Sequence, residues 1–155
     1  MPRTIVNPTT ERDGSPSPPS PPDPRFLAVI NAYDSDAPAE LRTTGTARDA
    51  RYVRPSGWPA GIGYNFWRKN QNTTVVQLEF SEKWRECLAD CLASFDGREV
   101  ADRKGKLSWD PTHGKLNAEF PIEQSGTIAQ AMRDLILMTK DVVSAKINEC
   151  LDAAG

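Results

Sequence analysis

Two apolar alternations flank a short polar tripeptide and match each other residue by residue. The tripeptide is Asn70-Gln71-Asn72, and the alternating residues are Ile62, Tyr64 and Phe66 before it and Val76, Leu78 and Phe80 after it. An apolar residue at every second position is typical of a strand with one buried face. A three-residue loop pairs Lys69 with Thr73, and this register sets each of these apolar residues opposite another. Residues 62–80 are therefore predicted to form a β-hairpin.

A second pair of alternating segments surrounds the turn residues Pro111-Thr112-His113-Gly114. A four-residue turn at this point pairs Asp110 with Lys115, Trp109 with Leu116 and Leu107 with Ala118, and the strand continues through Phe120 and Ile122. The two hairpins are predicted to share one apolar face. The opposite face is predicted to be polar with one large aromatic residue, and its members are Gly63, Asn65, Trp67, Val75, Gln77, Glu79, Ser108, Asn117 and Glu119.

Three segments carry apolar residues at the spacing of one helical face. The first follows Asp23-Pro24 and covers 26–33, the second follows Ser81 and covers 84–95, and the third follows Ser125 and extends to 151. Asp and Ser are favoured N-cap residues, and Pro is favoured at the first helical position. Antiparallel hairpins separated by helices predict an α+β domain, in which an antiparallel sheet of four to five strands packs against two or three helices.

The N-terminal segment has a different composition from the rest of the chain. Eight of the thirteen prolines lie in residues 1–24, with serines between them. Proline fixes φ and lacks a backbone donor, so this segment favours polyproline II over helix or strand. We predict a Pro- and Ser-rich disordered tail over 1–24 and a single α+β domain over 25–155. The tail is either a spacer or a docking peptide with Pro-x-x-Pro spacing.

Composition excludes several classes of protein. The 19 Lys and Arg against 21 Asp and Glu give a net charge of −2, which argues against a protein that coats a polyanion. No apolar run is long enough to span a membrane, and the N-terminus lacks the apolar core of a secretory signal, so a cytoplasmic location is expected. Three cysteines, an odd number in a reducing compartment, make a disulfide framework unexpected. The oligomeric state is left open.

No group of residues has the pattern of a catalytic or metal centre. His113 is the only histidine and lies in a predicted turn, without the shielding that tunes a general base. Cys87 and Cys91 are one helical turn apart, a spacing open to metal binding, but they share the apolar stripe of their helix and are expected in the core. Asp102-Arg103-Lys104 has the acid-x-Lys spacing of metal-dependent nucleases and is interpreted as a solvated charge run. We expect no enzyme, no metal and no cofactor.

The remaining signal is a segment in which basic and aromatic residues are interleaved. Its predicted binding surface consists of Arg48, Arg51, Arg54, Asn65, Trp67, Arg68 and Lys69. Arg and Trp are the residue types that anchor protein interfaces, so a protein partner is expected. The alternative is a nucleic-acid-binding domain, in which the basic residues neutralise phosphates and Trp67 stacks on a base.

Several segments of the chain also carry a family resemblance. They are Gly61-Ile62-Gly63 at the start of a strand, Val76-Gln77-Leu78-Glu79-Phe80 before a helix, Leu107-Ser108-Trp109 after it, and the closing helix from Ile128 to Leu151. Over residues 51–151 the chain resembles a bacterial α+β domain of unknown function found at the C-terminus of nuclease-like or defence-associated proteins. The order of elements also resembles type III secretion chaperones. The resemblance implies a partner-binding accessory domain and no catalytic residues.

Overall fold

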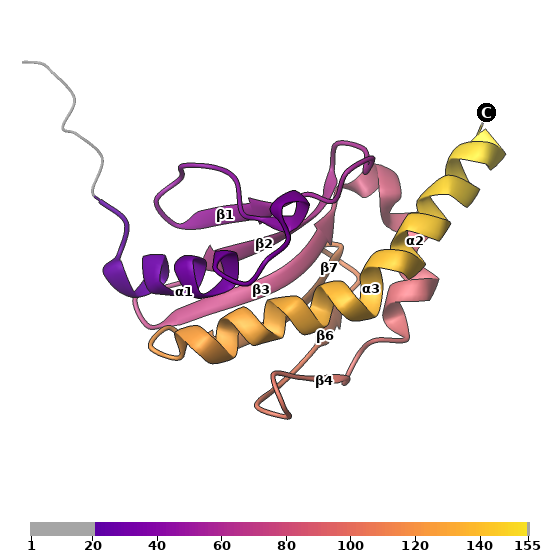
Figure 1. Cartoon of the computed structure of the whole chain (residues 1–155). Coiled ribbons are helices and arrows are strands. Elements are labelled where there is room, and N and C mark those ends of the chain that lie inside the picture. The colour runs from indigo at the N-terminus through magenta and orange to yellow at the C-terminus, as the bar shows by residue number, and fades with distance from the viewer. Residues whose placement is uncertain (1–20, 155) are drawn as a thin grey trace, which may run out of the picture.

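Three helices and two antiparallel sheets make up the chain between residues 21 and 154, the part that the computed structural model describes (Figure 1). The elements are α1 (Pro24–Asp34), the 3-10 turn η2 (Ala39–Leu41), β1 (Ala50–Val53), β2 (Ile62–Arg68), β3 (Thr73–Phe80), α2 (Glu82–Ala93), β4 (Glu99–Val100), β5 (Gly105–Lys106), β6 (Ser108–Asp110), β7 (Lys115–Pro121) and α3 (Ser125–Ala154). The predicted α+β class is confirmed. The predicted disordered tail lies outside the described residues, except for its last four.

The larger sheet has five strands in the order β1-β2-β3-β7-β6, and every neighbouring pair is antiparallel. The predicted register of the first hairpin is confirmed, because Tyr64 pairs with Leu78 and the Lys69 N–H donates to the Thr73 carbonyl at 2.9 Å. The two hairpins are joined through β3 and β7, where Leu78 pairs with Leu116. This long-range pairing aligns their apolar faces in one sheet.

The second hairpin is confirmed near its turn only. Trp109 pairs with Leu116 as predicted, but the predicted pairing of Leu107 with Ala118 is wrong because β6 begins at Ser108. The Leu107 N–H instead donates to the Arg98 carbonyl at 2.8 Å, in the chain that leaves α2. Strands β4 and β5 form a separate two-stranded sheet there. At Gly105 a Cβ would lie 2.5 Å from the Phe120 ring, so only glycine allows the chain to pass this close to β7.

The helices begin at or next to the predicted caps, but only Asp23 forms a side-chain capping hydrogen bond, because Ser81 makes none and Ser125 is itself the first residue of α3. The Asp23 carboxylate accepts from the Arg25 backbone N–H at 2.8 Å, and Pro24 occupies the first helical position. Helix α2 begins directly after Ser81. Helix α3 has 30 residues and includes Ser125 as its first residue. No helix of the described residues is both long enough and apolar enough to cross a membrane.

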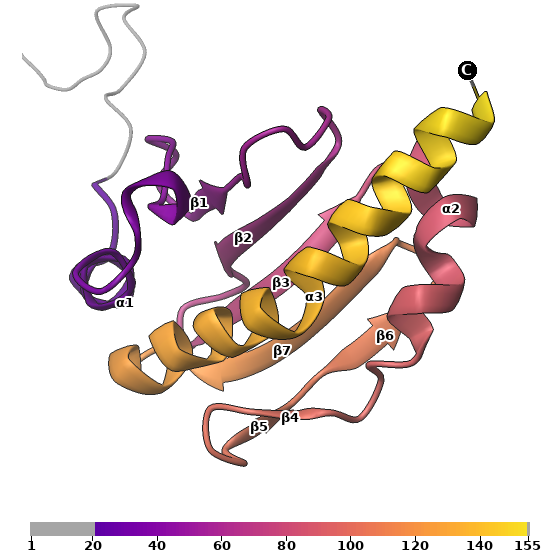
Figure 2. The ribbon, with the colours of Figure 1, turned by 45° about the vertical axis from the view of Figure 1, so that its right-hand side comes forward.

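All three helices pack on one side of the five-stranded sheet. Figure 2 shows α3 lying across β3 and β7, and α1 packs beside it. The sheet residues that face these helices are fully buried, among them Tyr64, Phe66, Val76, Leu78 and Leu116. They form one apolar cluster with residues of α1, α2 and α3. The core therefore lies between the sheet and the helices, as the alternation predicts.

A disulfide joins Cys87 in α2 to Cys150 near the end of α3, so the expectation that no disulfide forms is wrong. The two cysteines are 63 residues apart and meet only because α2 packs on α3. Cys91 is free and half-buried, and burial raises the pKa of its thiol. Within residues 21–154 no three His, Cys, Asp or Glu side chains gather in a way that could hold a metal ion.

Candidate functional site

The sheet has a second face, directed away from the helices, which we call the outer face. Its members follow from the strand register, because paired residues lie on the same side of a sheet. They are Ala50, Tyr52, Gly63, Asn65, Trp67, Val75, Gln77, Glu79, Ser108, Asp110, Lys115, Asn117 and Glu119. The nine residues predicted for this face all lie on it.

An oriented chain of hydrogen bonds crosses the middle of the outer face. The Gln77 side-chain amide donates to the Asn65 amide oxygen at 2.9 Å, and the Asn65 amide donates to the Glu79 carboxylate at 2.7 Å. A carboxylate only accepts, so Glu79 fixes the orientation of Asn65, and Asn65 fixes that of Gln77. Asn65 and Gln77 are 3% and 4% exposed, so neighbouring side chains hold both amides in place. The result is a rigid row of three polar groups.

Two aromatic rings flank this row, and each ring has a cation against it. The Lys115 ammonium lies 5.5 Å from the centre of the Trp67 ring, and the Arg54 guanidinium lies 5.5 Å from the centre of the Tyr52 ring. Trp67 is 38% exposed, which makes it one of the few exposed large apolar residues of the described chain. Aromatic and cationic groups of this kind are enriched at the centres of protein interfaces.

The outer face is hollowed on both sides of Asn65 and Glu79. One hollow, of about 270 Å³, is lined by Tyr52, Arg54, Gly63, Asn65, Glu79 and Ser81 among others. The neighbouring hollow, of about 200 Å³, is lined by Ala50, Tyr52, Asn65, Trp67, Gln77, Glu79 and Lys115. Gly63 has no side chain, and this leaves the first hollow open. A Cβ at this position would make only ordinary contacts of 3.6 Å, so a larger residue here would extend into the hollow. The two hollows share three lining residues, Tyr52, Asn65 and Glu79, and we refer to the two together as the depression.

The two edges of the sheet are closed by groups of the same chain. At the β1 edge, Thr44 exchanges two backbone hydrogen bonds with Tyr52, at 2.7 and 3.0 Å, and Arg51 donates to the Ala50 carbonyl at 2.8 Å. At the β6 edge, the Trp109 N–H donates to the Asp96 carboxylate at 2.8 Å. These contacts block the addition of a further strand at these positions. The open surface of the sheet is thus its outer face.

The seven residues of the predicted binding surface do not form one surface. Arg54, Asn65 and Trp67 lie on or beside the outer face, as expected. Arg51 pairs with Phe66 and therefore lies on the helix side, where its guanidinium is 6.0 Å from the Phe26 ring centre. The prediction that Arg51 and Trp67 share one surface is therefore wrong.

Acidic side chains neutralise the other basic residues of the predicted surface. Arg68 also lies on the helix side, within 3.3 Å of both Asp23 and Asp49. Arg48 binds the same Asp49 at 2.8 Å, and its hydrogen bonds lower the pKa of that carboxyl. Lys69 is on the outer face and binds Glu119 at 2.7 Å. These cations are committed to pairs within the chain.

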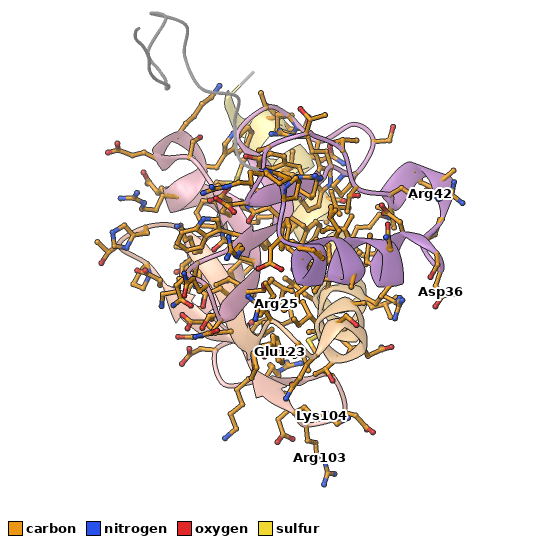
Figure 3. The ribbon with its side chains drawn as sticks, turned by 90° about the vertical axis from the view of Figure 1, so that its left-hand side faces the viewer. Arg25, Asp36, Arg42, Arg103, Lys104 and Glu123 are labelled. Atoms are coloured by element: carbon orange, nitrogen blue, oxygen red, sulfur yellow. A yellow bond between two sulfur atoms is a disulfide. The ribbon has the colours of Figure 1, made fainter. Side chains whose placement is uncertain are left out.

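Arg25 forms similar ion pairs, which tie α1 to the turn before α3. Its guanidinium lies 2.8 Å from Asp23 and 3.0 Å from Glu123, and Figure 3 shows Arg25 and Glu123 facing each other. The side-chain hydrogen bond from Arg25 lowers the pKa of Asp23 to about 2. This cluster belongs to the attachment of α1 and lies apart from the outer face.

The other candidates from the sequence lie in exposed turns. His113 is in the β6–β7 turn, 2.8 Å from Asp110, and its hydrogen bond lowers the pKa of that carboxyl. Asp102 and Arg103 have left-handed backbone conformations in the turn between β4 and β5. Figure 3 shows Arg103 and Lys104 pointing away from the body of the molecule. Asp102 and Lys104 border a shallow hollow of about 300 Å³ against the start of α3, and His113 and Asp110 lie on the exposed surface.

Four residues that line the depression were left out of the predicted binding residues. Tyr52 lies on the outer face because β1 pairs with β2, and Lys115 lies beside Glu79 because β7 pairs with β3. Gln77 and Glu79 were placed on the polar face without a role. The predicted register of β2 and β3 already sets Glu79 opposite Gly63. A carboxylate facing a glycine could have indicated the hollow from the sequence.

Comparisons with protein families, curated proteins and solved structures found no match for the chain at a significant level.

Proposed function

We propose that this chain is a non-catalytic interaction domain that binds a protein partner through the depression on the outer face. The observation that carries the proposal is Trp67, an exposed large aromatic residue at the border of a hollow on the one sheet face without a helix. Burying such a ring against a partner contributes strongly to binding. The closed edges of the sheet favour binding on the face over strand addition.

The distribution of charge favours a protein over a nucleic acid. A carboxylate, Glu79, lies at the centre of the depression and opposes a phosphate backbone. The ring faces of Trp67 and Tyr52 already have cations against them, so a base stacks on them only by displacing Lys115 or Arg54. Arg48, Arg68 and Lys69, which the nucleic-acid alternative requires, are paired with acids.

Site-specific photo-crosslinking tests the proposal in the cells that produce the protein. A photoreactive phenylalanine analogue replaces Trp67 in one variant and Arg103 in a control, because the Arg103 side chain is 85% exposed in a turn remote from the depression. We expect a discrete protein adduct from position 67 and none of that mass from position 103. Adducts that are identical at both positions, or absent at both, contradict the proposal.

A mobility-shift titration with DNA and RNA tests the alternative that the chain binds nucleic acid. We expect no shift of DNA or RNA at low salt. A shift that weakens steeply between about 50 and 200 mM salt, and that Arg54→Glu abolishes, supports the alternative instead. Arg54 is the suitable position because it has no ion-pair partner among the described residues, whereas reversing Arg68 breaks two ion pairs of the fold.

The assembly in which the domain acts is part of the proposal. The resemblance found in the sequence suggests an accessory subunit of a bacterial defence or regulatory assembly. The closed sheet edges and the open face suit a subunit that holds a partner while another protein performs the chemistry. Mass spectrometry of the adduct from position 67 identifies that partner and so tests the assignment.

The expected cytoplasmic location stays a prediction. The disulfide between Cys87 and Cys150 is an observation against it, because such bonds are rare in reducing compartments. Trapping thiols with a mass-tagged alkylating reagent at the moment of lysis shows whether the disulfide is present in the cell, and so whether the protein is held in a reducing compartment. A cytoplasmic protein held reduced gains three tags, and an oxidised protein gains one, because one of its three cysteines is free.

A further inference from the structure

We infer that the depression recognises a lysine or arginine side chain of an extended partner segment, with the cation bound by Glu79 and acidic neighbours bound by Arg54 and Lys115. This inference rests on the proposed function and names the chemistry of the partner. It follows from the charges around the hollow, from the orientation of the buried amides and from the space above Gly63.

The Glu79 carboxylate is held in position without an ion-pair partner in the described part of the chain, although Lys115 lies opposite it in β7 and Arg54 lines the same hollow. One of its oxygens accepts from the Asn65 amide at 2.7 Å. Glu79 forms no ion pair with any residue from 21 to 154, although it is only partly exposed. A carboxylate that is already held in position loses little conformational entropy when it binds a cation. Glu79 lines both hollows, and its second oxygen accepts no hydrogen bond from the described residues, which leaves it as the acceptor for such a group.

The space beside Glu79 fits one long side chain. Gly63 lies directly opposite Glu79 in the sheet, and its missing side chain opens the hollow of about 270 Å³. The Tyr52 ring and the Asn65 amide line the same hollow. A lysine or arginine stem packs against the ring while its charged end reaches the carboxylate. Only one or two side chains fit in a space of this size, so the hollow acts as a subsite and not as an entire interface.

The rim of the depression has the opposite charge from its centre. Arg54 and Lys115 border the two hollows, and neither forms an ion pair with a described residue. Each cation instead rests against an aromatic ring at 5.5 Å. The pattern of a central anion between two cations complements a segment with a basic residue between acidic ones. Complementary charge of this kind sets the register and specificity of binding.

The buried amides favour a peptide over an isolated ion. Gln77 lines the second hollow, and its amide oxygen makes no hydrogen bond with any residue from 21 to 154, while one of its N–H groups is held by Asn65. The amide of Gln77 therefore keeps one acceptor and one donor for a partner, which is the complement of a backbone peptide group. A segment that runs across both hollows satisfies Gln77 with its backbone and Glu79 with its side chain.

Selection from a library of random linear peptides displayed on phage tests the inference. The wild-type chain is compared with Glu79→Gln and Glu79→Lys, and with Glu86→Gln as a control on the exposed surface of α2. We expect the wild type and the control to enrich peptides with a Lys or Arg flanked by Asp or Glu. Glu79→Gln loses the preference for the basic residue, and Glu79→Lys replaces it with a preference for an acidic one.

A binding cycle with one selected peptide shows whether Glu79 acts through the cation. Affinity is measured by fluorescence anisotropy for the peptide and for its Lys-to-norleucine or Arg-to-norleucine version. We expect Glu79→Gln to weaken binding of the basic peptide about tenfold, because a hydrogen bond to a charged group contributes roughly this much to affinity. The affinity of Glu79→Gln for the norleucine peptide is expected to stay within about twofold of the wild-type value. Gly63→Val fills the hollow at a position without positive φ and is expected to abolish both.

Three outcomes overturn the inference: no peptide is enriched, the enriched peptides lack a basic residue, or Glu79→Gln weakens both peptides equally. Circular dichroism and thermal unfolding of each variant verify that it is folded. If position 67 still crosslinks to a partner, and Glu79→Lys does not reduce that adduct, only the charge assignment fails. If position 67 gives no adduct, the proposed function itself fails.

Discussion

The Lys115 ammonium in β7 lies 5.5 Å from the centre of the Trp67 ring in β2, although another strand separates the two. This contact spans the outer face and holds the Trp67 ring at the border of the depression. It also leaves the ring partly exposed, at 38%, while Val75 opposite it is buried. Trp67 therefore combines a modest contribution to folding with a surface that a partner can cover.

Replacing Trp67 by Ala is expected to lower the free energy of unfolding by about 1 to 2 kcal/mol, because part of the ring is already in water. Phe66→Ala is the matched control on the opposite face of the same strand. Phe66 is fully buried, so its truncation is expected to cost about 3 to 5 kcal/mol. Urea unfolding measures both variants. A larger loss for Trp67→Ala than for Phe66→Ala means that Trp67 belongs to the core.

A buried hydrogen bond between Tyr64 in β2 and Thr139 in α3 gives a second prediction. The hydroxyls are 2.8 Å apart, and Thr139 donates its only hydroxyl hydrogen to the Leu135 carbonyl at 2.6 Å, so Tyr64 is the donor. Burial raises the pKa of Tyr64 above its ordinary range. Tyr64→Phe removes the donor and is expected to cost about 1 kcal/mol.

Thr139→Val leaves the Tyr64 hydroxyl buried without an acceptor and is expected to cost about 2 to 3 kcal/mol. The double variant removes both polar groups, so it is expected to cost less than the sum of the two single changes. A double-mutant cycle by chemical denaturation measures this difference. Additive losses contradict the assignment of Tyr64 as donor to Thr139.

The disulfide between Cys87 and Cys150 closes a loop with a sequence separation of 63. The entropy of closing such a loop in the unfolded chain corresponds to about 4 kcal/mol. Cys150→Ser is therefore expected to lower the unfolding midpoint, and a reductant is expected to lower that of the wild type to a similar value. Cys91→Ser is the control and leaves the effect of the reductant intact. A midpoint that does not respond to reductant means that the bond contributes no stability.

The Asp23 carboxyl gives a prediction about acid. Its pKa is lowered from 3.8 to about 2 in the folded chain, mainly by the side-chain hydrogen bond from Arg25. A folded-state pKa below the unfolded value stabilises the fold above about pH 4, and this stabilisation is lost as the pH falls toward 2. Asp23→Asn keeps a helix cap and removes the charge. Its difference in stability from the wild type is expected to shrink between about pH 5 and pH 2, measured by urea midpoints. A difference that stays constant with pH excludes a role for the charge.

Local patterns were enough to predict the hairpin from 62 to 80, because a shift of one residue moves every apolar side chain of a strand to the wrong face. The same pattern placed Trp67 on the outer face. The interleaved basic and aromatic segment led to the wrong grouping of Arg51 with Trp67. Arg51 belongs to a separate short strand, and local sequence does not specify how that strand pairs with β2. The N-cap at Asp23 could also be predicted from local sequence, because a cap involves only neighbouring residues.

The sequence by itself determined the three helices, the main strands, the apolar face of each hairpin and the polar character of the other face, because these depend on residues close together in the chain. It did not predict the short strands β4 and β5. Only the tertiary structure decided that β7 pairs with β3, which brings Lys115 to Trp67 and places a cation at the rim of the hollow around Glu79. It also decided that Cys87 meets Cys150. These relationships join distant segments, and they form only when burial of the common core offsets the entropy of closing long loops.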